Sequence, residues 1–156
     1  MNDDISAAEI RQAQFPHNLF ISGLFLFDLL LTPVILGLEL GMAGMLIPLS
    51  CSAALLAYIC LRSKQSGHAF VDAHWRLACR HGRWLLYAYA ISALLIFVAW
   101  LISLIAHDAH MGHILWTALT RIALLPTLVM VMVSAVMEAS ALGMAGKGDT
   151  PPPTSR

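Results

Sequence analysis

The feature that most constrains this chain is a series of four long apolar stretches with almost no charge. They cover residues 19–38, 41–61, 84–106 and 113–137. Each is close to the ~20 apolar residues that a helix needs to cross a bilayer, and none shows the alternation over ~10 residues that marks a membrane β-strand. Only Asp28 and Arg121 interrupt them. The sequence therefore predicts an all-α, polytopic membrane protein with four transmembrane helices.

Composition leads to the same conclusion. The chain has 156 residues, of which 59% are hydrophobic and 12% charged. Soluble domains of this size are about 45–50% apolar and about 25% charged. The formal net charge is zero, so no overall positive field attracts nucleic acid, and we expect no nucleic-acid partner.

The distribution of basic residues predicts the topology. Between the second and third stretches lie Arg62, Lys64, Arg76, Arg80 and Arg83, whereas the connections at 39–40 and 107–112 hold no Lys or Arg. Because basic loops stay on the inner side, we expect the 62–83 loop and both termini in the cytoplasm, with the chain in a bacterial inner membrane. The expected organisation is a polar cytoplasmic segment 1–18, a transmembrane domain 19–137 built as two hairpins in a bundle, and a disordered cytoplasmic tail 138–156.

The segment from Phe70 to Trp84 can form a helix with apolar residues on one face and arginines on another. We expect it to lie as an interfacial amphipathic segment between the second and third transmembrane helices, in contact with anionic headgroups. The residues predicted to contact lipid or a partner are His74, Trp75, Arg76, Arg80 and Arg83. The alternative is that these charges only hold the loop on the cytoplasmic side.

A family resemblance covers residues 57–84. Ala57-Tyr58, Arg62, His74-Trp75-Arg76, Arg80 and Trp84 resemble a pattern in uncharacterised small four-helix bacterial inner-membrane proteins that are distantly Tic20-like. Ala73 replaces the serine of that pattern, and Ala78 stands where glutamine is common. The resemblance implies four membrane helices and carries no activity.

Asp28 and Arg121 are the ionisable residues inside the apolar stretches. A lone charge there costs at least ~2.5–3.5 kcal/mol on insertion scales. Counting residues from the outer ends places the two at depths that differ by only ~3–5 Å, which predicts an intramembrane ion pair. Alternatively, Arg121 extends to the interface while Asp28 stays protonated, or the two line a proton or ion pathway.

Histidines suggest two kinds of cofactor site, although the sequence gives no firm reason to expect any cofactor. His107, His110 and His113 recur every three residues at the expected outer side, where they could ligate zinc or copper. Haem b held between histidines of facing helices is the second reading, because His17 and either His74 or His81 are expected at the same membrane level. For the metal cluster the alternative is ordinary histidines in a solvated turn. Against haem, no histidine lies in the interior of the apolar length of any expected span.

The three cysteines are expected to be free thiols. Cys51 and Cys60 would lie about 13 Å apart along one helix, and Cys79 falls in a segment assigned to the reducing cytoplasm.

No phosphate-binding loop, Cys-x-x-Cys motif or nucleophile elbow occurs in the sequence, so we do not expect an enzyme. The first expectation is a non-catalytic accessory or scaffold subunit that contacts other membrane subunits or a second copy of itself. The alternatives are a haem- or quinone-binding membrane anchor of a respiratory electron-transfer complex, and a small transporter or channel subunit.

Overall fold

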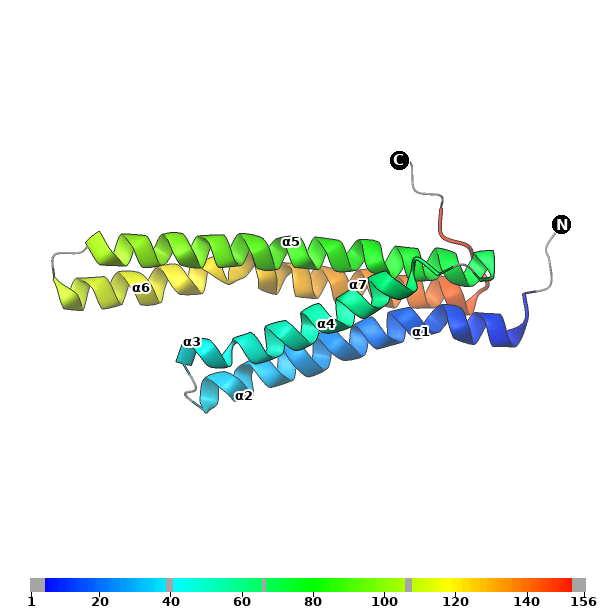
Figure 1. Cartoon of the computed structure of the whole chain (residues 1–156), viewed down its shortest axis with the longest axis horizontal. Coiled ribbons are helices and arrows are strands. Elements are labelled where there is room, and N and C mark those ends of the chain that lie inside the picture. Colours follow the sequence, from blue (N-terminus) through cyan, green and yellow to red (C-terminus); the bar gives the residue numbers. More distant parts are fainter. Residues whose placement is uncertain (1–4, 39–40, 66, 106–107, 153–156) are drawn as a thin grey trace. The chain divides into compact units, whose positions relative to one another are not determined.

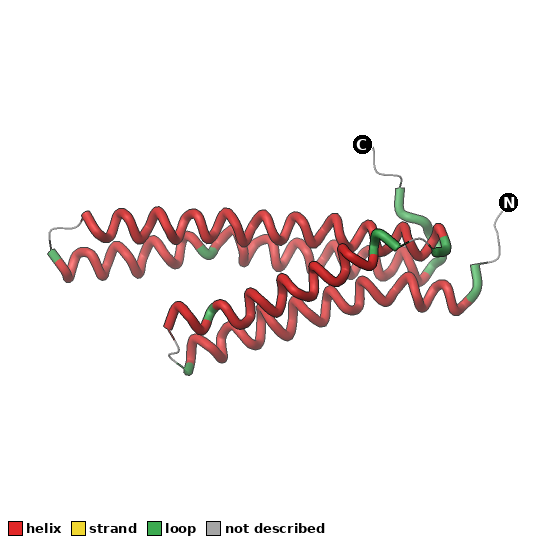
Figure 2. The backbone as a smooth tube through the Cα atoms, in the orientation of Figure 1, coloured by secondary structure: helices red, strands yellow, loops and turns green. Residues whose placement is uncertain are grey.

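The structure, a computed structural model, describes residues 5–38, 41–65, 67–105 and 108–152. All regular elements within those ranges are helices (Figure 2). Figure 1 labels most of them along the chain. Their bounds are α1 Ala7–Gly23, η1 Leu24–Leu31, α2 Thr32–Gly37, α3 Gly41–Gly44, α4 Leu46–Arg62, α5 Ala69–Ile105, α6 Ala109–Ala123 and α7 Leu125–Gly146.

Three of these helical segments are long and apolar enough to cross a membrane: Ala7–Ile35, Ala69–Ile105 and His110–Gly146. The chain is therefore a helical protein with the character of a membrane protein. The remaining apolar helix, α4, has 17 residues. Its length of about 26 Å falls slightly short of a ~30 Å hydrocarbon core, so the fourth crossing remains a prediction.

The chain divides into two compact units. The first unit comprises Met1–Gly82 and Ser134–Arg156, and it therefore contains α1 to α4, the start of α5 and the end of α7. The second unit comprises Arg83–Val133, which includes the rest of α5, all of α6 and the start of α7.

In the first unit, α1 begins at a capping box. The Ser6 hydroxyl accepts a hydrogen bond from the Glu9 backbone N–H, and the Glu9 carboxylate accepts one from the Ser6 N–H. These contacts satisfy donors that a helix start leaves without partners. Helix α1 and its continuation η1 run beside α4 (Figure 1). The approach is close at Gly23, where an added Cβ would lie 2.8 Å from a methyl carbon of Leu55.

Helix α5 differs from the expectation of a separate interfacial segment. Phe70–Trp84 is the first part of one continuous 37-residue helix that runs on through the expected third transmembrane stretch. Phe70, Val71 and Leu77 are buried in the protein and do not face headgroups. The amphipathic pattern was recognised in the sequence, but its apolar face packs on protein.

The second unit contains most of α5, all of α6 and the start of α7. Asp108 caps α6 by accepting a hydrogen bond from the His110 backbone N–H. The helix is interrupted at Leu124, two residues before Pro126, because proline lacks an N–H and its ring clashes with the preceding turn. The Thr127 hydroxyl then donates to the Ser92 hydroxyl at 2.9 Å and joins α7 to α5.

Helix α7 continues well into the region expected to be a disordered tail. It ends at Gly146, and Ala141 and Ala145 are fully buried. The chain then turns in a Schellman motif, in which the Asp149 N–H donates to the Met144 carbonyl and Gly148 adopts a positive φ of 76°. Burial of a small-residue face explains why these residues are ordered.

We predict that Gly82→Ala destabilises the protein. An added Cβ would lie 2.8 Å from a Leu56 methyl carbon and 3.3 Å from the Phe20 ring. The expected loss is about 1–2 kcal/mol of unfolding free energy, because overpacking outweighs the better helix propensity of alanine. Thermal unfolding in detergent measures it. Gly143→Ala is the matched control, since its Cβ would meet nothing within 4 Å; equal stability of the two variants would contradict the prediction.

Candidate functional site

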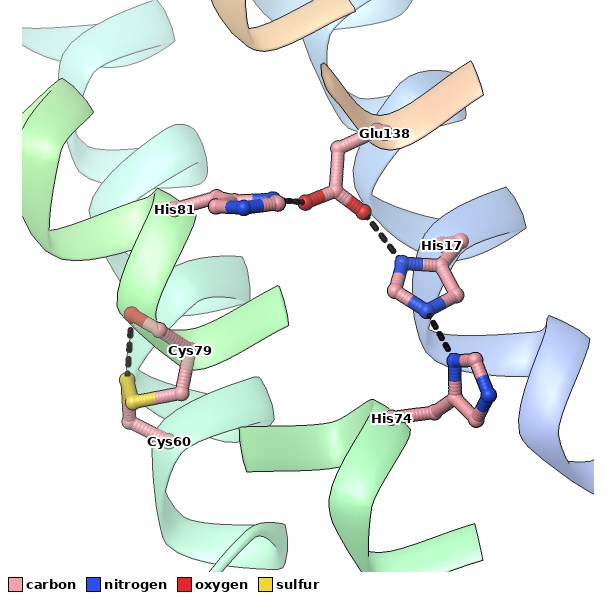
Figure 3. A network of polar contacts seen from close by, with 6 residues as sticks. All are labelled: His17, Cys60, His74, Cys79, His81 and Glu138. Atoms are coloured by element: carbon pink, nitrogen blue, oxygen red, sulfur yellow. Dashed lines mark hydrogen bonds and ion pairs between the residues drawn. A yellow bond between two sulfur atoms is a disulfide. The ribbon is translucent and has the colours of Figure 1, made fainter. Parts of the chain in front are cut away.

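Three histidines and one glutamate form a continuous chain of polar contacts inside the first unit (Figure 3). His17 Nδ1 lies 2.6 Å from Glu138 Oε2, and His17 Nε2 lies 3.0 Å from His74 Nδ1. The other carboxylate oxygen, Glu138 Oε1, lies 2.6 Å from His81 Nδ1. We call this arrangement the imidazole–carboxylate chain: His74, His17, Glu138 and His81, in that order.

Three helices that are distant in sequence position these side chains. His17 comes from α1 and Glu138 from α7, whereas His74 and His81 both come from α5. The two α5 histidines lie seven residues apart, so they project from one face of the helix. His17, His74 and Glu138 have no exposed surface, and His81 is 5% exposed. Charges and polar atoms this deeply buried are costly unless each is paired.

Counting hydrogens shows that every contact of the imidazole–carboxylate chain has its hydrogen when the four side chains are neutral in total. The carbonyl of Asp149 lies 3.2 Å from His74 Nε2 and can only accept, so His74 carries a hydrogen there. The three contacts between His74, His17, Glu138 and His81 each need one further hydrogen. Three neutral imidazoles supply three hydrogens, and one added proton makes four and balances the carboxylate. Burial favours this neutral count.

The fourth proton has more than one place to reside. With the proton on His17, that ring is an imidazolium donating to both His74 and Glu138. Moving one hydrogen across the 3.0 Å contact to His74 transfers the charge without breaking the chain. Each imidazole offers two nitrogens that exchange donor and acceptor roles. The arrangement can therefore hold an excess proton and shift it along existing hydrogen bonds.

The ends of the chain differ in their access to water. At one end, His74 Nε2 is closed off by the Asp149 carbonyl of the C-terminal turn. At the other end, His81 is the one member with an exposed fraction of its side chain, 6%. A proton from solvent would therefore enter or leave through His81.

As placed, these residues hydrogen-bond to one another in a way that does not suit a metal. Metal–nitrogen bonds of about 2.0–2.1 Å put two ligating nitrogens roughly 3.3–4 Å apart, whereas the His17 and His74 nitrogens are 3.0 Å apart. Haem iron between the His17 and His74 rings would require their 3.0 Å contact to open, and haem binding stays a prediction. Within the described ranges, no group of three or more His, Cys, Asp or Glu side chains is arranged to hold a metal ion.

Glu138 was not predicted as a site residue. The sequence predicts His17 at the same level as His74 or His81, but only as possible haem ligands. The missed signal is a seam with steps of three and four residues: buried positions on α5 at 74, 78, 81, 85, 88 and 92, and on α7 at 131, 134, 138, 141 and 145. Such spacing marks a face that packs along another helix, and it places His81 and Glu138 on packed faces.

Asp28 lies in η1, an eight-residue π-helical segment. The Ser52 hydroxyl of α4 donates to the Asp28 carboxylate at 3.1 Å, and Ser52 is buried. Segments of π-helix occur frequently at functional sites. Arg121 is exposed and belongs to the second unit, whereas Asp28 belongs to the first. The Asp28–Arg121 ion pair therefore stays a prediction.

The residues predicted to contact lipid or a partner separate into two groups. His74 and Trp75 are buried, and Trp75 stacks beneath the Arg62 guanidinium at 5.4 Å from its ring centroid. Arg76, Arg80 and Arg83 are exposed. The structure thus places two of the five inside the protein and leaves the three arginines at its surface.

The predicted metal cluster is described only in part, because His107 lies outside the described residues. His110 and His113 are exposed in the first turns of α6. Metal binding by this cluster also stays a prediction.

The prediction of three free thiols was wrong. Cys60 and Cys79 form a disulfide between α4 and α5, with Cα atoms 4.9 Å apart, and Cys51 remains free. The expected compartment of Cys79 carries no information on its distance from Cys60. The short connection after Arg62 brings the end of α4 beside the start of α5, which places the two cysteines within bonding distance.

We predict that Glu138→Ala loses about 3–5 kcal/mol of unfolding free energy. The change leaves the facing nitrogens of His17 and His81 buried without their acceptor, and breaking a buried charged network costs that much. Glu138→Gln should lose less, about 1–3 kcal/mol, because the amide still accepts one hydrogen bond. Thermal unfolding of the purified protein measures both.

Ser134→Ala is the control for these variants. Ser134 lies one turn before Glu138 on α7 and is fully buried, but its hydroxyl has no hydrogen-bond partner among the described residues. Its removal should leave stability unchanged or slightly higher. A loss in Glu138→Ala no larger than that in Ser134→Ala would show that the imidazole–carboxylate chain does not stabilise the protein.

Comparison with known proteins gives no match: no family model, no curated protein and no solved structure matches this chain.

Proposed function

We propose that this protein is a small multi-pass membrane protein that binds and passes protons, as a transporter or channel subunit. The observation that carries the proposal is the buried imidazole–carboxylate chain, in which the contacts at both Glu138 oxygens and both His17 nitrogens form one line. A structural clasp between helices needs only one neutral pair. Four titratable groups linked in a row by hydrogen bonds can do what a single pair cannot, because a proton can move from one group to the next.

Asp28 supplies a second protonatable group in the same unit. It lies eleven residues after His17 along α1 and η1, which corresponds to about 16 Å of helix rise, and it is bonded to buried Ser52. Ionisable residues inside apolar helices commonly mark proton or ion pathways. The two sites are in different surroundings, because the imidazole–carboxylate chain is deeply buried and Asp28 is half-buried.

We place both termini in the cytoplasm and the chain in a bacterial inner membrane, with four crossings in two hairpins. Support comes from Arg62 and Lys64 after α4 and from exposed Arg76 and Arg80 at the start of α5. On this topology the imidazole–carboxylate chain lies at the cytoplasmic end. The exposed arginines are then suited to contact anionic headgroups, each worth about 1 kcal/mol.

A non-catalytic accessory subunit is the second candidate. Large apolar side chains are exposed along α7, including Leu128, Val129, Met132 and Val136. Lipid or helices of other membrane subunits would cover this face. Gentle detergent extraction followed by native mass spectrometry tests this candidate, which predicts a defined stoichiometric partner.

Proton flux in liposomes tests the main proposal. We expect the protein to acidify or alkalinise vesicles when a potential is applied, as read by a trapped pH-sensitive dye. Glu138→Gln should lower the initial rate by roughly 100-fold, the lower end of what a positioned proton-transfer group contributes. Asp28→Asn should also lower the rate, if this residue is the second site.

Glu9→Gln is the matched control, because it makes the same chemical change at a surface carboxylate that caps α1. Its rate should equal that of the unaltered protein, since glutamine also fits a capping box. Flux no faster than in empty vesicles, or equal flux with and without Glu138→Gln, would overturn the proposal.

A further inference from the structure

We infer that the Cys60–Cys79 disulfide is a redox-controlled latch that holds α4 against α5 and so keeps the imidazole–carboxylate chain assembled. The latch deepens the proposed function and rests on its topology, but it has a readout of its own. The disulfide is close in sequence to the chain's α5 members: Cys79 lies between His74 and His81 on α5 (Figure 3).

The crosslink lies three residues from a close approach of α5 to α4 and α1 at Gly82. One residue after His81, Gly82 leaves room for Leu56 of α4 and Phe20 of α1, where a Cβ would come within 2.8 and 3.3 Å. The Cys60 sulfur also lies 3.7 Å from the Cys79 carbonyl oxygen. The position of α4 on α5 therefore affects the backbone that carries both His74 and His81.

The proposed location of the disulfide exposes it to a reducing compartment. Arg62 and Lys64 follow Cys60 directly, and the proposed topology puts this end in the cytoplasm. Cytoplasmic thiol systems keep most cysteines reduced, and the disulfides that do form there are mostly transient, catalytic or redox-sensing. A fixed structural crosslink is therefore not expected at this end, whereas one that opens and closes is.

The chemistry of opening is a two-step exchange with a dithiol reductant. The reductant's thiolate attacks the sulfur of half-buried Cys60, since Cys79 is only 3% exposed. The S–S bond breaks, and Cys79 leaves as a thiolate that takes up a proton. The second thiol of the reductant then attacks the reductant's first sulfur, which is bonded to Cys60 in the mixed disulfide. Cys60 is released as a thiolate and also takes up a proton. Two electrons and two protons reach the cysteines, and the dithiol becomes a disulfide.

Closure of the latch is the reverse exchange with an oxidised dithiol. When closed, α4 is held and the histidines of α5 stay within reach of His17 and Glu138. When open, α4 is free to shift at Gly82, and His74 and His81 lose their fixed register. The oxidised protein should therefore be the form with the intact imidazole–carboxylate chain.

Alkylation after acid quenching of whole cells tests whether the latch opens. Once the quenched protein is denatured, a maleimide should label Cys60 and Cys79 from cells in normal growth, as read by mass spectrometry, and a thiol oxidant added before the quench should protect both. Cys51 should be labelled to the same extent in both conditions. Protection of Cys60 and Cys79 in every condition would show a permanent crosslink and overturn the inference.

Nitrogen NMR of the histidine rings tests whether the latch controls the chain. In ¹⁵N-histidine protein in nanodiscs, adding a reductant should change the imidazole signals of His17, His74 and His81. The Cys60→Ser, Cys79→Ser double variant should show the reduced pattern and no response, and Cys51→Ser should respond like the unaltered protein. Identical spectra before and after reduction would overturn the inference, whether or not the protein conducts protons.

Flux in liposomes separates this inference from the proposed function. The oxidised protein should conduct at a rate at least about 5-fold different from the reduced protein, the lower end of typical coupling between sites. Equal, nonzero rates in the two forms would overturn the latch and leave proton transfer standing. An absence of flux in both forms would overturn proton transfer, and the NMR comparison would still decide the latch.

Discussion

The contacts of one buried carboxylate organise the first compact unit. Glu138 bridges His17 of α1 and His81 of α5 at 2.6 Å each, so a single side chain of α7 joins three helices. Because the side chains of Glu138 and His17 have no exposed surface, their polar atoms depend on partners from the protein. His17 extends the bridge to His74, and the backbone of the C-terminal turn completes it. The requirement to satisfy all these polar atoms fixes the register of α1, α5 and α7 against one another more strictly than apolar packing would.

That requirement also connects structure to the proposed activity. An apolar seam of the same spacing would hold these helices without titratable groups. The imidazole–carboxylate chain instead keeps one mobile proton in a neutral cluster, with one end shut by a carbonyl and the other close to the surface. Such a cluster can exchange a proton with solvent at its His81 end. The disulfide between α4 and α5 adds a covalent restraint beside it, so its geometry is open to influence from thiol chemistry as well as from proton concentration.

Much of the fold could be predicted from the sequence, and much of the site could not. Long uncharged stretches predicted helices suited to a membrane, since their length and composition reflect the solvent directly. Contacts between helices that are distant in sequence are harder to predict from the sequence. His17, His74 and His81 could be placed at one level by counting residues, but Glu138 looked like an interfacial residue because α7 was expected to end there. Cys79 was assigned a free thiol from the compartment alone, which says nothing of the distance to Cys60. His81 and Glu138 fall in the three- and four-residue spacing of the buried positions on α5 and α7, which marks packed faces but does not identify these two residues as partners.

The Schellman turn after α7 has a consequence for which positions tolerate change. His74 is bonded to the main-chain oxygen at position 149, not to the aspartate side chain, so almost any amino acid there leaves the contact intact. The geometry depends on the preceding glycine, whose φ of 76° other residues rarely adopt. Evolutionary constraint at this turn should therefore fall on Gly148, which has no side-chain functional group, whereas the side chain at Asp149 can vary.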